Sequence, residues 1–415
     1  MSTKMGKLRG MMTVGAVALA MCCAAAARAD VTSDQGAALL VFPKIVVDTQ
    51  GRLSSGPFVG EPTDTVIQLT NIAQEQIAAH CTIVDATPRC TNLVNNVRPP
   101  CTVDSDCVGG ICEPQWGPPI DFVVNLTKRQ PVRWKASEGS GECKCRKFPC
   151  SQGDKYPCLI ANVPSDPFIG EMKCVEVDPN TLIPVGPPGV PSVRKPKGDL
   201  IGEATVVVED SDPQSVASDA RQYNAIGLQL EGPQDPNPLT LNVGGPNAEY
   251  TGCPNVVIAD HLFDDAVVTT HGGIVTGTVK THLTVVPCTE DFQQANPPPS
   301  VVLQFLVFNE FEQRFSTSTR LTCFKETLLS DIDTRSVESD NYASIFNFRV
   351  QGTLSGQTRI RSVSSSTSAN GVLAVLEEFW ECDSGPANMC TTAANTHKTG
   401  STRPLGDVIT LEDAR

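Results

Sequence analysis

The chain has 415 residues, a formal net charge of −14 and 40% hydrophobic residues. This length is sufficient for two or three domains with hydrophobic cores. The negative charge repels phosphate backbones and anionic lipid surfaces, so the composition argues against a nucleic acid as partner. Aromatic residues make up only 5% of the chain, which disfavours an extended platform of rings for stacking on sugars.

Residues 1–29 predict a cleaved signal peptide. A basic start is followed by an apolar run and by Ala27-Arg28-Ala29, which is the order of a secretory signal with a small-residue cleavage site. A retained anchor is the alternative, but the run is short and rich in alanine and glycine. No second hydrophobic span follows. We therefore expect a secreted, periplasmic or cell-surface protein without a transmembrane segment after cleavage.

Cysteine usage agrees with export. Of the 17 cysteines, two lie in the signal peptide and fifteen follow it. Disulfides persist in exported proteins, so we expect two disulfide-stapled loop insertions, at about residues 85–119 and 136–160. The spacing does not determine which cysteines pair. The odd number leaves at least one cysteine outside any intramolecular pair.

Two stretches, residues 301–324 and 65–84, predict the fold class. Each contains an apolar strand, an asparagine corner (Asn309 and Asn71) and a second strand with β-branched residues. Side chains alternate across a strand, and a strand that is apolar on both faces is typical of a packed sandwich. We interpret both stretches as hairpins. The predicted fold is all-β, with tandem antiparallel β-sandwich domains and disulfide-rich loop insertions.

Proline-rich stretches suggest the domain boundaries. Pro43 interrupts the first strand, at residues 37–49, which indicates an edge position or a bend. Prolines at residues 183–197 cannot hold a sheet ladder and predict a linker. The predicted order is a first β-sandwich domain at 30–182, the linker at 183–197, a connecting β region at 198–278, a second β-sandwich domain at 279–390 and a loose polar tail at 391–415.

The order of strands suggests an internal duplication. The second asparagine corner is followed by a strand at residues 345–350, by a glutamine shortly before an apolar-arginine pair at 357–361, and by an apolar strand at 372–379. Residues 122–126, 130–133 and 168–177 follow the first corner in the same order. A divergent duplication explains this order. Coincidence is the alternative, because β-sandwiches share a common pattern of strands.

The segments VFPKIVVD, NEFEQRFSTST and GQTRIR occur in this order along the chain. With them the chain resembles an uncharacterised family of exported all-β proteins from Gram-negative bacteria. The resemblance implies no activity, substrate or site residue. More loosely, the strand pattern is similar to immunoglobulin-like sandwiches, which carry many unrelated functions.

Two sets of side chains are weak candidates for metal ligands. His261, His271 and His282 would hold zinc if their strands brought the imidazoles together with an aspartate, but no compact zinc motif concentrates them. A single loop carries carboxylates that would suit calcium, without the twelve-residue pattern of a helix-loop-helix site. Solvated side chains are the plainer interpretation of both sets, so we expect no cofactor, with a structural calcium as the exception. The calcium candidates are Asp331, Asp333, Glu338 and Asp340.

No catalytic constellation is visible in the sequence. Glu377, Glu378 and Glu381 lie near Trp380, and we interpret them as the outer face of a strand rather than as a glycosidase pair. We find no pattern that predicts a buried titratable pair. The predicted function is an exported, non-catalytic structural or adhesive protein of the cell envelope, with an unknown protein or glycan partner. The alternative is a secreted hydrolase or carbohydrate-active protein whose site forms only in three dimensions.

Overall fold

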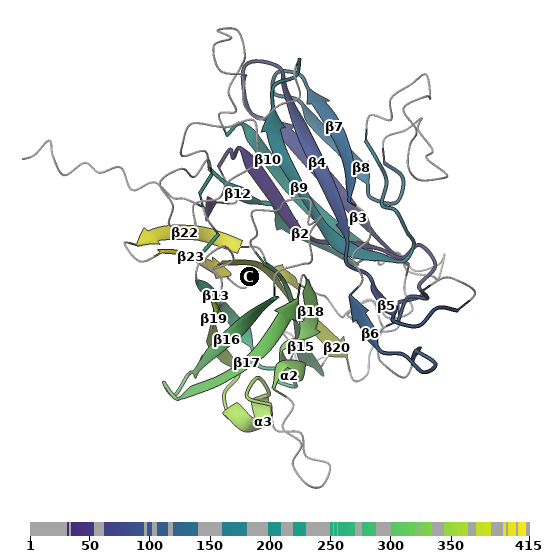
Figure 1. Ribbon diagram of the computed structural model, residues 1–415. Helices are drawn as coiled ribbons and strands as arrows, with labels where there is room; N and C mark the ends of the chain where they lie inside the picture. Colours follow the sequence, from purple (N-terminus) through teal and green to yellow (C-terminus); the bar gives the residue numbers. More distant parts are fainter. Residues whose placement is uncertain are drawn as a thin grey trace, which may run out of the picture.

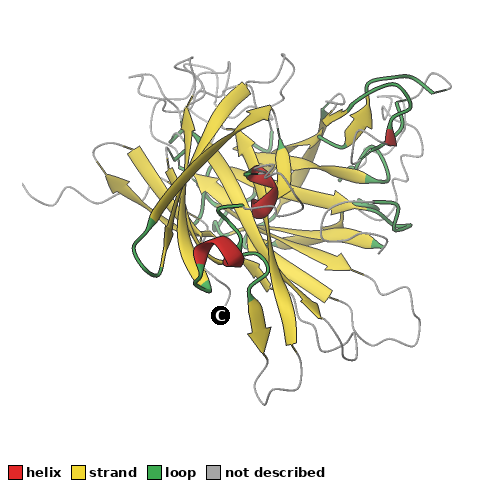
Figure 2. Cartoon of the chain, turned by 90° about the horizontal axis from the view of Figure 1, so that it is seen from below, coloured by secondary structure: helices red, strands yellow, loops and turns green. Residues whose placement is uncertain are grey.

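The computed structural model confirms the all-β prediction, and all but one of the strand pairings that it describes are antiparallel (Figures 1 and 2). Only two short helices occur among the described residues, α2 (Leu329–Ile332) and α3 (Phe348–Gln351). The predicted signal peptide, the proline-rich linker and most of the second cysteine-rich insertion lie outside the described residues. The structure describes residues 31–32, 35–53, 62–94, 98–101, 106–114, 119–139, 160–180, 198–208, 219–229, 250–251, 253–254, 256–269, 276–287, 300–322, 324–333, 344–363, 371–382, 393–395, 397–403 and 406–411.

The strands up to residue 228 form two sheets that face each other. Sheet 1 has the order β1-β12-β2-β9-β4-β7, and sheet 2 has the order β11-β10-β3-β8. Apolar side chains of both sheets meet in one core that includes Phe42, Ile67, Leu69 and Phe168. The strands are β1 (Val31–Thr32), β2 (Leu39–Val47), β3 (Thr63–Asn71), β4 (Ile77–Asp85), β7 (Ile120–Leu126), β8 (Pro131–Lys135), β9 (Phe168–Val177), β10 (Leu200–Val208), β11 (Asp219–Asn224) and β12 (Ile226–Leu228).

The strands from residue 256 onward form a second pair of sheets. Sheet 3 has the order β17-β16-β19-β13-β23-β22, and sheet 4 has the order β14-β15-β20-β21, with β18 paired to β15. The strands are β13 (Val256–Leu262), β14 (Val267–Thr269), β15 (Thr276–Pro287), β16 (Ser300–Asn309), β17 (Arg314–Thr322), β18 (Lys325–Leu328), β19 (Ser355–Val363), β20 (Val372–Cys382), β21 (Ala393–Asn395), β22 (His397–Arg403) and β23 (Gly406–Leu411).

The described strands cross two of the predicted boundaries, and one predicted strand is partly helical. Strands β10 to β12 lie after the proline-rich stretch but complete sheets 1 and 2, so residues 198–278 are not a separate connecting region. The polar tail contains β21, β22 and β23, and β23 pairs in parallel with β13. Residues 348–351 form α3 instead of part of a strand.

The two pairs of sheets share a hydrophobic core. Leu39 and Val41 of β2 point away from sheet 2 and belong to the same buried cluster as Leu303 of β16 and Leu376 of β20. Sheet 1 is therefore apolar on both faces, which explains why β2, β4 and β9 are buried along nearly their whole length. The two halves pack directly on each other, and their division into tandem sandwich domains stays a prediction.

Strand β2 is bent at Pro43. Its register against β9 shifts between Phe42 and Ile45, and it lies between β12 and β9 rather than at an edge. Proline is tolerated there because the pairing with β12 ends at Val41 and because a bulge needs no ladder hydrogen bond. The bulge turns the next side chain, Lys44, out of the first core and toward sheet 4.

Lys44 is fully buried at the contact between the two halves. Its ammonium group forms an ion pair of 2.6 Å with Glu326 of β18 and a second with Glu377 of β20. Burial lowers the pKa of Lys44, but the two carboxylates outweigh it and raise that pKa above its ordinary value. The hydroxyl of Tyr223 accepts from the Lys44 backbone N–H at 3.2 Å and donates to the Lys44 carbonyl. The bulged backbone is thereby satisfied.

The two asparagine corners have the same local structure. The Oδ1 of Asn71 accepts the N–H of Ala73 at 2.7 Å, and the Oδ1 of Asn309 accepts the N–H of Phe311 at 3.0 Å. Strands β16 and β17 then form the predicted hairpin. The prediction is wrong for the first corner, because β3 belongs to sheet 2 and β4 to sheet 1.

The predicted duplication agrees with part of the topology. β3 pairs with β8 so that Gln68 lies opposite Arg133, and β16 pairs with β19 so that Gln304 lies opposite Arg361. An apolar strand then follows in the opposite sheet in both halves, β9 and β20. The corners lead to different second strands, so the duplication stays a prediction.

Candidate functional site: a disulfide-stapled loop

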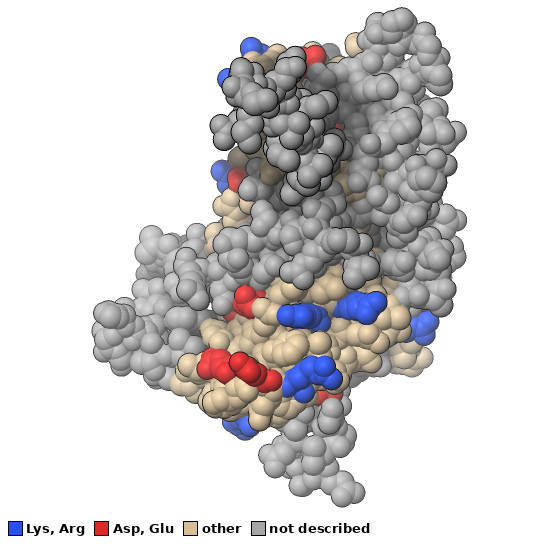
Figure 3. Space-filling model, turned by 90° about the vertical axis from the view of Figure 1, so that its left-hand side faces the viewer, with Lys and Arg blue, Asp and Glu red and all other residues tan. Residues whose placement is uncertain are grey.

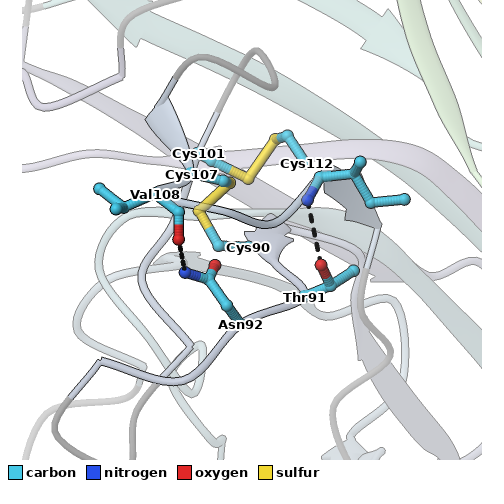
Figure 4. Close-up of a disulfide and its surroundings, with 8 residues drawn as sticks. Cys90, Thr91, Asn92, Cys101, Cys107, Val108 and Cys112 are labelled. Carbon is cyan, nitrogen blue, oxygen red and sulfur yellow. Dashed lines mark hydrogen bonds between the residues drawn. A yellow bond between two sulfur atoms is a disulfide. The ribbon is translucent and has the colours of Figure 1, made fainter.

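The first cysteine-rich insertion is built around the short hairpin-like pair of β5 (Pro88–Cys90) and β6 (Cys112–Pro114). Cys90 lies directly opposite Cys112 in this pairing, but the two do not bond to each other. The disulfides instead join Cys90 to Cys107 and Cys101 to Cys112. Along the chain, Cys101 lies between Cys90 and Cys107, and Cys107 lies between Cys101 and Cys112. The two disulfides are therefore crossed in sequence (Figure 4).

Hydrogen bonds fix the segments between the cysteines. The N–H of Thr91 donates to the carbonyl of Ile111 at 2.9 Å, and the Thr91 hydroxyl accepts the N–H of Ile111 at 3.0 Å. The side-chain amide of Asn92 donates to the carbonyl of Val108 (Figure 4). Gly109 adopts a φ of 75°, in the left-handed region that favours glycine, and so allows the turn between Val108 and Ile111.

This stapled loop, residues 88–114, presents apolar side chains to solvent. Val108 is 86% exposed, Leu93 60%, Ile111 52% and Val94 48%. The disulfides have drawn the cysteines inward, since Cys90, Cys101 and Cys107 are all buried. Apolar groups that gather on a fixed loop, rather than scatter singly, mark an interaction surface.

The base of the stapled loop is tied to sheet 1. The buried carboxylate of Asp85, at the end of β4, accepts the N–H of Thr87 at 2.9 Å and faces the Arg89 guanidinium at 3.4 Å. Within the sheet, a third disulfide joins Cys81 of β4 to Cys174 of β9, which lie directly opposite each other. The loop therefore projects from a covalently braced pair of strands.

The cysteine sulfurs of the stapled loop are the one cluster of possible metal ligands within the described part of the chain. All of them are engaged in disulfides, and a disulfide sulfur has no thiolate with which to bind a metal. Their proximity is explained by the two neighbouring disulfides.

The predicted zinc ligands do not converge. His261 of β13 points into the second half, where its Nε2 contacts the Thr358 hydroxyl at 2.7 Å. His282 of β15 lies beside Glu377 on the opposite face of sheet 4, toward the first half. His271 lies outside the described residues. Burial lowers the pKa of His261 to about 4, and burial together with Lys44 lowers that of His282 to about 3.

The calcium candidates are only partly described. Asp331 lies in α2, and burial raises the pKa of its carboxyl group. Asp333 ends that helix, and its carboxylate contacts the Thr317 hydroxyl at 3.4 Å and the Ile345 N–H at 3.3 Å. Protein donors therefore already bind Asp333, while Glu338 and Asp340 lie outside the described residues.

The prediction that the glutamates of β20 form an outer strand face is wrong for Glu377 and Glu378. Glu377 and Glu378 are both buried, on opposite faces of the strand. Glu377 binds Lys44, and Glu378 accepts the N–H of Leu262 at 2.7 Å. Neither lines the described pocket, which lies on sheet 3.

The buried ion pairs of Lys44 with Glu326 and Glu377 have no counterpart among the predictions from sequence. A lysine inside the apolar run VFPKIVVD was the available signal. A lysine almost never lies in a fully buried strand without a charged partner, so two acidic partners were to be expected.

Comparison with known proteins identifies no relative. No known protein family matches the chain, and no curated protein matches it. Among the described residues, no helix is long and apolar enough to cross a membrane. The function must therefore be inferred from the chain's own surfaces.

Proposed function

We propose that this is an exported, non-catalytic interaction protein of the cell envelope that docks onto a partner protein through the stapled loop. The observation that carries the proposal is the exposure of Leu93, Val94, Val108 and Ile111 on a loop closed by two crossed disulfides. Disulfides are typical of exported proteins, which supports a role outside the cytoplasm.

Rigidity favours a docking role for the stapled loop. Ordering a mobile loop on binding opposes association by about 0.5–1.5 kcal/mol for each immobilised side chain. Two disulfides and the bonds from Thr91 and Asn92 fix the described segments of this loop, which carry the four exposed apolar side chains, before any partner binds. Most of the apolar contact area gained on docking then contributes to affinity.

A protein partner fits the chemistry of the stapled loop better than a glycan. Its large exposed hydrophobic side chains are aliphatic, and aliphatic groups offer neither hydrogen bonds to hydroxyls nor rings for stacking on sugars. Protein interfaces instead have an apolar centre surrounded by a polar rim. The nearby Asn92 and Arg89 can provide part of such a rim.

The test uses binding of the mature protein to envelopes isolated from the producing cells. We expect the double variant Val108→Ser and Ile111→Ser to bind at least about tenfold more weakly. The matched control is Val350→Ser with Leu354→Ser, which removes two exposed apolar side chains from the second half. This control should bind as the wild type does.

Two further arms define the partner and the role of the disulfides. Treatment of the envelopes with protease should abolish binding if the partner is a protein. Reduction of the disulfides before binding should weaken it. Unchanged binding of the Val108 and Ile111 variant, or equal loss in the control, would refute docking through the stapled loop.

A screen of the purified protein against esters, glycosides and peptides tests the non-catalytic part of the proposal. We expect no turnover with any of the three substrate classes. Robust turnover that a point mutation removes would instead favour the secreted hydrolase.

A further inference from the structure

The outer face of sheet 3, away from the shared core, combines arginines with small polar side chains. Its outward positions on β17 and β19 carry four arginines in a chain of net charge −14. The lower half of the molecule shows basic side chains gathered beside acidic ones (Figure 3). The outward residues of β16, β17 and β19 that bear on a ligand are Gln304, Phe308, Ser318, Gln357, Arg359 and Arg361.

Arg359 is held in a fixed position on this face. The Nε2 of Gln357 donates to Asp260 at 3.0 Å, and the Oε1 of the same glutamine accepts from the Arg359 Nε at 3.3 Å. The guanidinium carbon lies 5.1 Å from the centre of the Phe308 ring, so the planar group is stacked. Among the described residues these contacts use only Nε and the face of the guanidinium. Its two Nη groups are thus available to donate bidentate hydrogen bonds to an anion.

A second arginine lies beside Arg359. Arg361 is two residues further along β19, so its side chain emerges on the same face about 7 Å away. Across the sheet, Arg361 is aligned with Gln304 and Ser318, whose polar groups also face outward. Two neighbouring guanidinium groups repel each other, and a shared anionic ligand removes this repulsion.

A pocket adjoins the arginines at the end of the sheet. Its volume is about 450 Å³, within the range of pockets that take small ligands. Asp260, Phe308, Glu310 and Gln357 line it. Glu310 is positioned by the N–H and hydroxyl of Ser355, at 3.0 and 2.7 Å. Carboxylates and an amide around a small hollow accept hydrogen bonds from hydroxyl groups, which sugar rings carry on several of their carbons.

We propose that the outer face of sheet 3 binds an anionic polysaccharide. Its carboxylate or sulfate groups lie on Arg359 and Arg361, and an adjoining sugar ring donates its hydroxyls to Asp260 and Glu310 in the pocket. The two carboxylates repel an anion, so the charged group is directed to the arginine end of the site. This site is separate from the stapled loop and lies on the other half of the molecule.

Other polyanions suit this face less well. Nucleic acid presents phosphates where the pocket needs hydroxyl donors, and the Asp260 and Glu310 carboxylates repel phosphates. Single-stranded nucleic acids also bind by stacking bases on aromatic side chains, whereas the Phe308 ring on this face is stacked with Arg359. A polysaccharide presents hydroxyl groups next to its charged groups, which matches a site with arginines at one end and carboxylates at the other.

The first half supplies a matched control. Arg133 and Lys135 are exposed on β8 of sheet 2, and Arg133 occupies the same place opposite Gln68 that Arg361 occupies opposite Gln304. Changing both to glutamine removes the same charge as changing Arg359 and Arg361. Any effect of net charge alone is therefore equal in the two double variants.

The experiment measures binding of polygalacturonate, dextran sulfate and neutral dextran to the mature protein by calorimetry. We expect one or both anionic polymers to bind, which identifies the preferred charged group, and dextran not to bind. The variant R359Q/R361Q should lose at least about tenfold in affinity, while R133Q/K135Q retains wild-type affinity. Binding should also weaken as salt rises from 0.05 to 0.5 M, about the range over which exposed charges become screened.

A third variant tests the positioning of Arg359 without a change of charge. Gln357→Ala removes the bond that holds the Arg359 Nε, so we expect a loss of about threefold to tenfold with an unaltered unfolding temperature. The proposal is overturned if R359Q/R361Q binds like the wild type, or if R133Q/K135Q loses as much. Tighter binding of single-stranded DNA of equal charge overturns the assignment to polysaccharides.

Discussion

Strands β3 and β16 end in the same asparagine corner, yet the chain leaves the two corners in different directions. After Asn309 the chain turns back, and β17 pairs with β16. After Asn71 it crosses to the other sheet, and β4 pairs with β7 and β9. The corner therefore specifies a turn, and the strand that follows decides which sheet it joins.

The difference lies in the faces of the second strand. β4 is buried on both faces, and sheet 1, which packs between sheet 2 and the second half, offers it two apolar surfaces. β17 alternates serine, threonine and arginine with partly buried residues, so it remains beside β16 at the edge of the sheet. Arginine on an edge strand also disfavours pairing with further chains.

The largest effect is expected where the two halves meet. Lys44→Met leaves the buried carboxylate of Glu377 without its ammonium partner, and breaking a buried ion pair costs about 3–5 kcal/mol. Urea denaturation measures the change in unfolding free energy. The control is Lys280→Met, which breaks a partly exposed pair with Asp265 and should cost no more than about 1 kcal/mol. Equal effects of the two changes would contradict a structural role for Lys44.

A decrease in pH should also destabilise the contact and the second half. The folded-state pKa of His261 is about 4 and that of His282 about 3, both below the value of 6.5 in an unfolded chain. The unfolded chain therefore takes up protons first, so the stability present above pH 6.5 is lost as the pH falls toward 3. Each histidine contributes about 3 kcal/mol or more over this range.

Asp264 acts in the opposite direction. Burial raises its pKa to about 6, above the unfolded value of 3.8, so its contribution to stability is fully present below pH 3.8 and is lost as the pH rises through 6. Unfolding free energies of the wild type and of His282→Phe, measured from pH 4 to 7, separate the contribution of His282 from that of Asp264. The variant should show a shallower loss in acid, and an unchanged slope would contradict the burial of a neutral His282.

The two corners themselves should differ in the cost of their removal. The Nδ2 group of Asn71 donates to the carbonyls of Glu75, Leu126 and Thr127, and so joins the turn to the end of β7. The Nδ2 group of Asn309 reaches one distant carbonyl, that of Gln351, at 3.3 Å. Each asparagine side chain makes four hydrogen bonds, but two of those of Asn71 reach Leu126 and Thr127, whereas one of those of Asn309 leaves its turn. At about 1 kcal/mol for each bond that leaves the turn, we expect Asn71→Ala to cost about 1 kcal/mol more than Asn309→Ala.

Chemical denaturation of the two alanine variants tests this order. A greater loss at Asn309 would mean that the hairpin, rather than the crossing between sheets, depends more on its corner. It would also contradict the account of Asn71 as the tie between β3 and β7.

The smallest effect on stability is expected on the outer face of sheet 3. Arg359 and Arg361 are exposed, and surface substitutions of this kind usually change the unfolding free energy by no more than about 0.5 kcal/mol. Thermal unfolding of R359Q/R361Q should therefore match that of the wild type. A clearly lower unfolding temperature would mean that these arginines support the fold rather than a ligand.

Alternation along the chain was sufficient to predict an all-β fold and the hairpin at residues 301–324, and the number of cysteines predicted disulfides in the first insertion. The spacing of the cysteines does not predict that Cys90 pairs with Cys107, because several pairings are equally possible. Alternation also does not predict that the chain passes from sheet 2 to sheet 1 between β3 and β4. Periodicity reports which faces of a strand are apolar and leaves open which sheet covers them.

The candidate site shows the same limit. The position of the stapled loop followed from its cysteines, but the exposure of Val108 and Ile111 depends on which side chains the disulfides draw inward. Lys44 and Glu377 are 333 residues apart in the chain, so no local pattern joins them. Gln357 and Arg359 lie in the segment GQTRIR, but the hydrogen bond from Gln357 to Asp260 depends on the pairing of β13 with β19.

Mass-spectrometric mapping of the native disulfides tests most directly whether crossed bonds fix an apolar docking surface on the stapled loop. The structure predicts peptides that join Cys90 to Cys107 and Cys101 to Cys112, together with the bond from Cys81 to Cys174 inside the sheet. Free thiols at these positions, or a bond between the facing residues Cys90 and Cys112, would contradict it, because the loop that presents Val108 and Ile111 would then have a different shape.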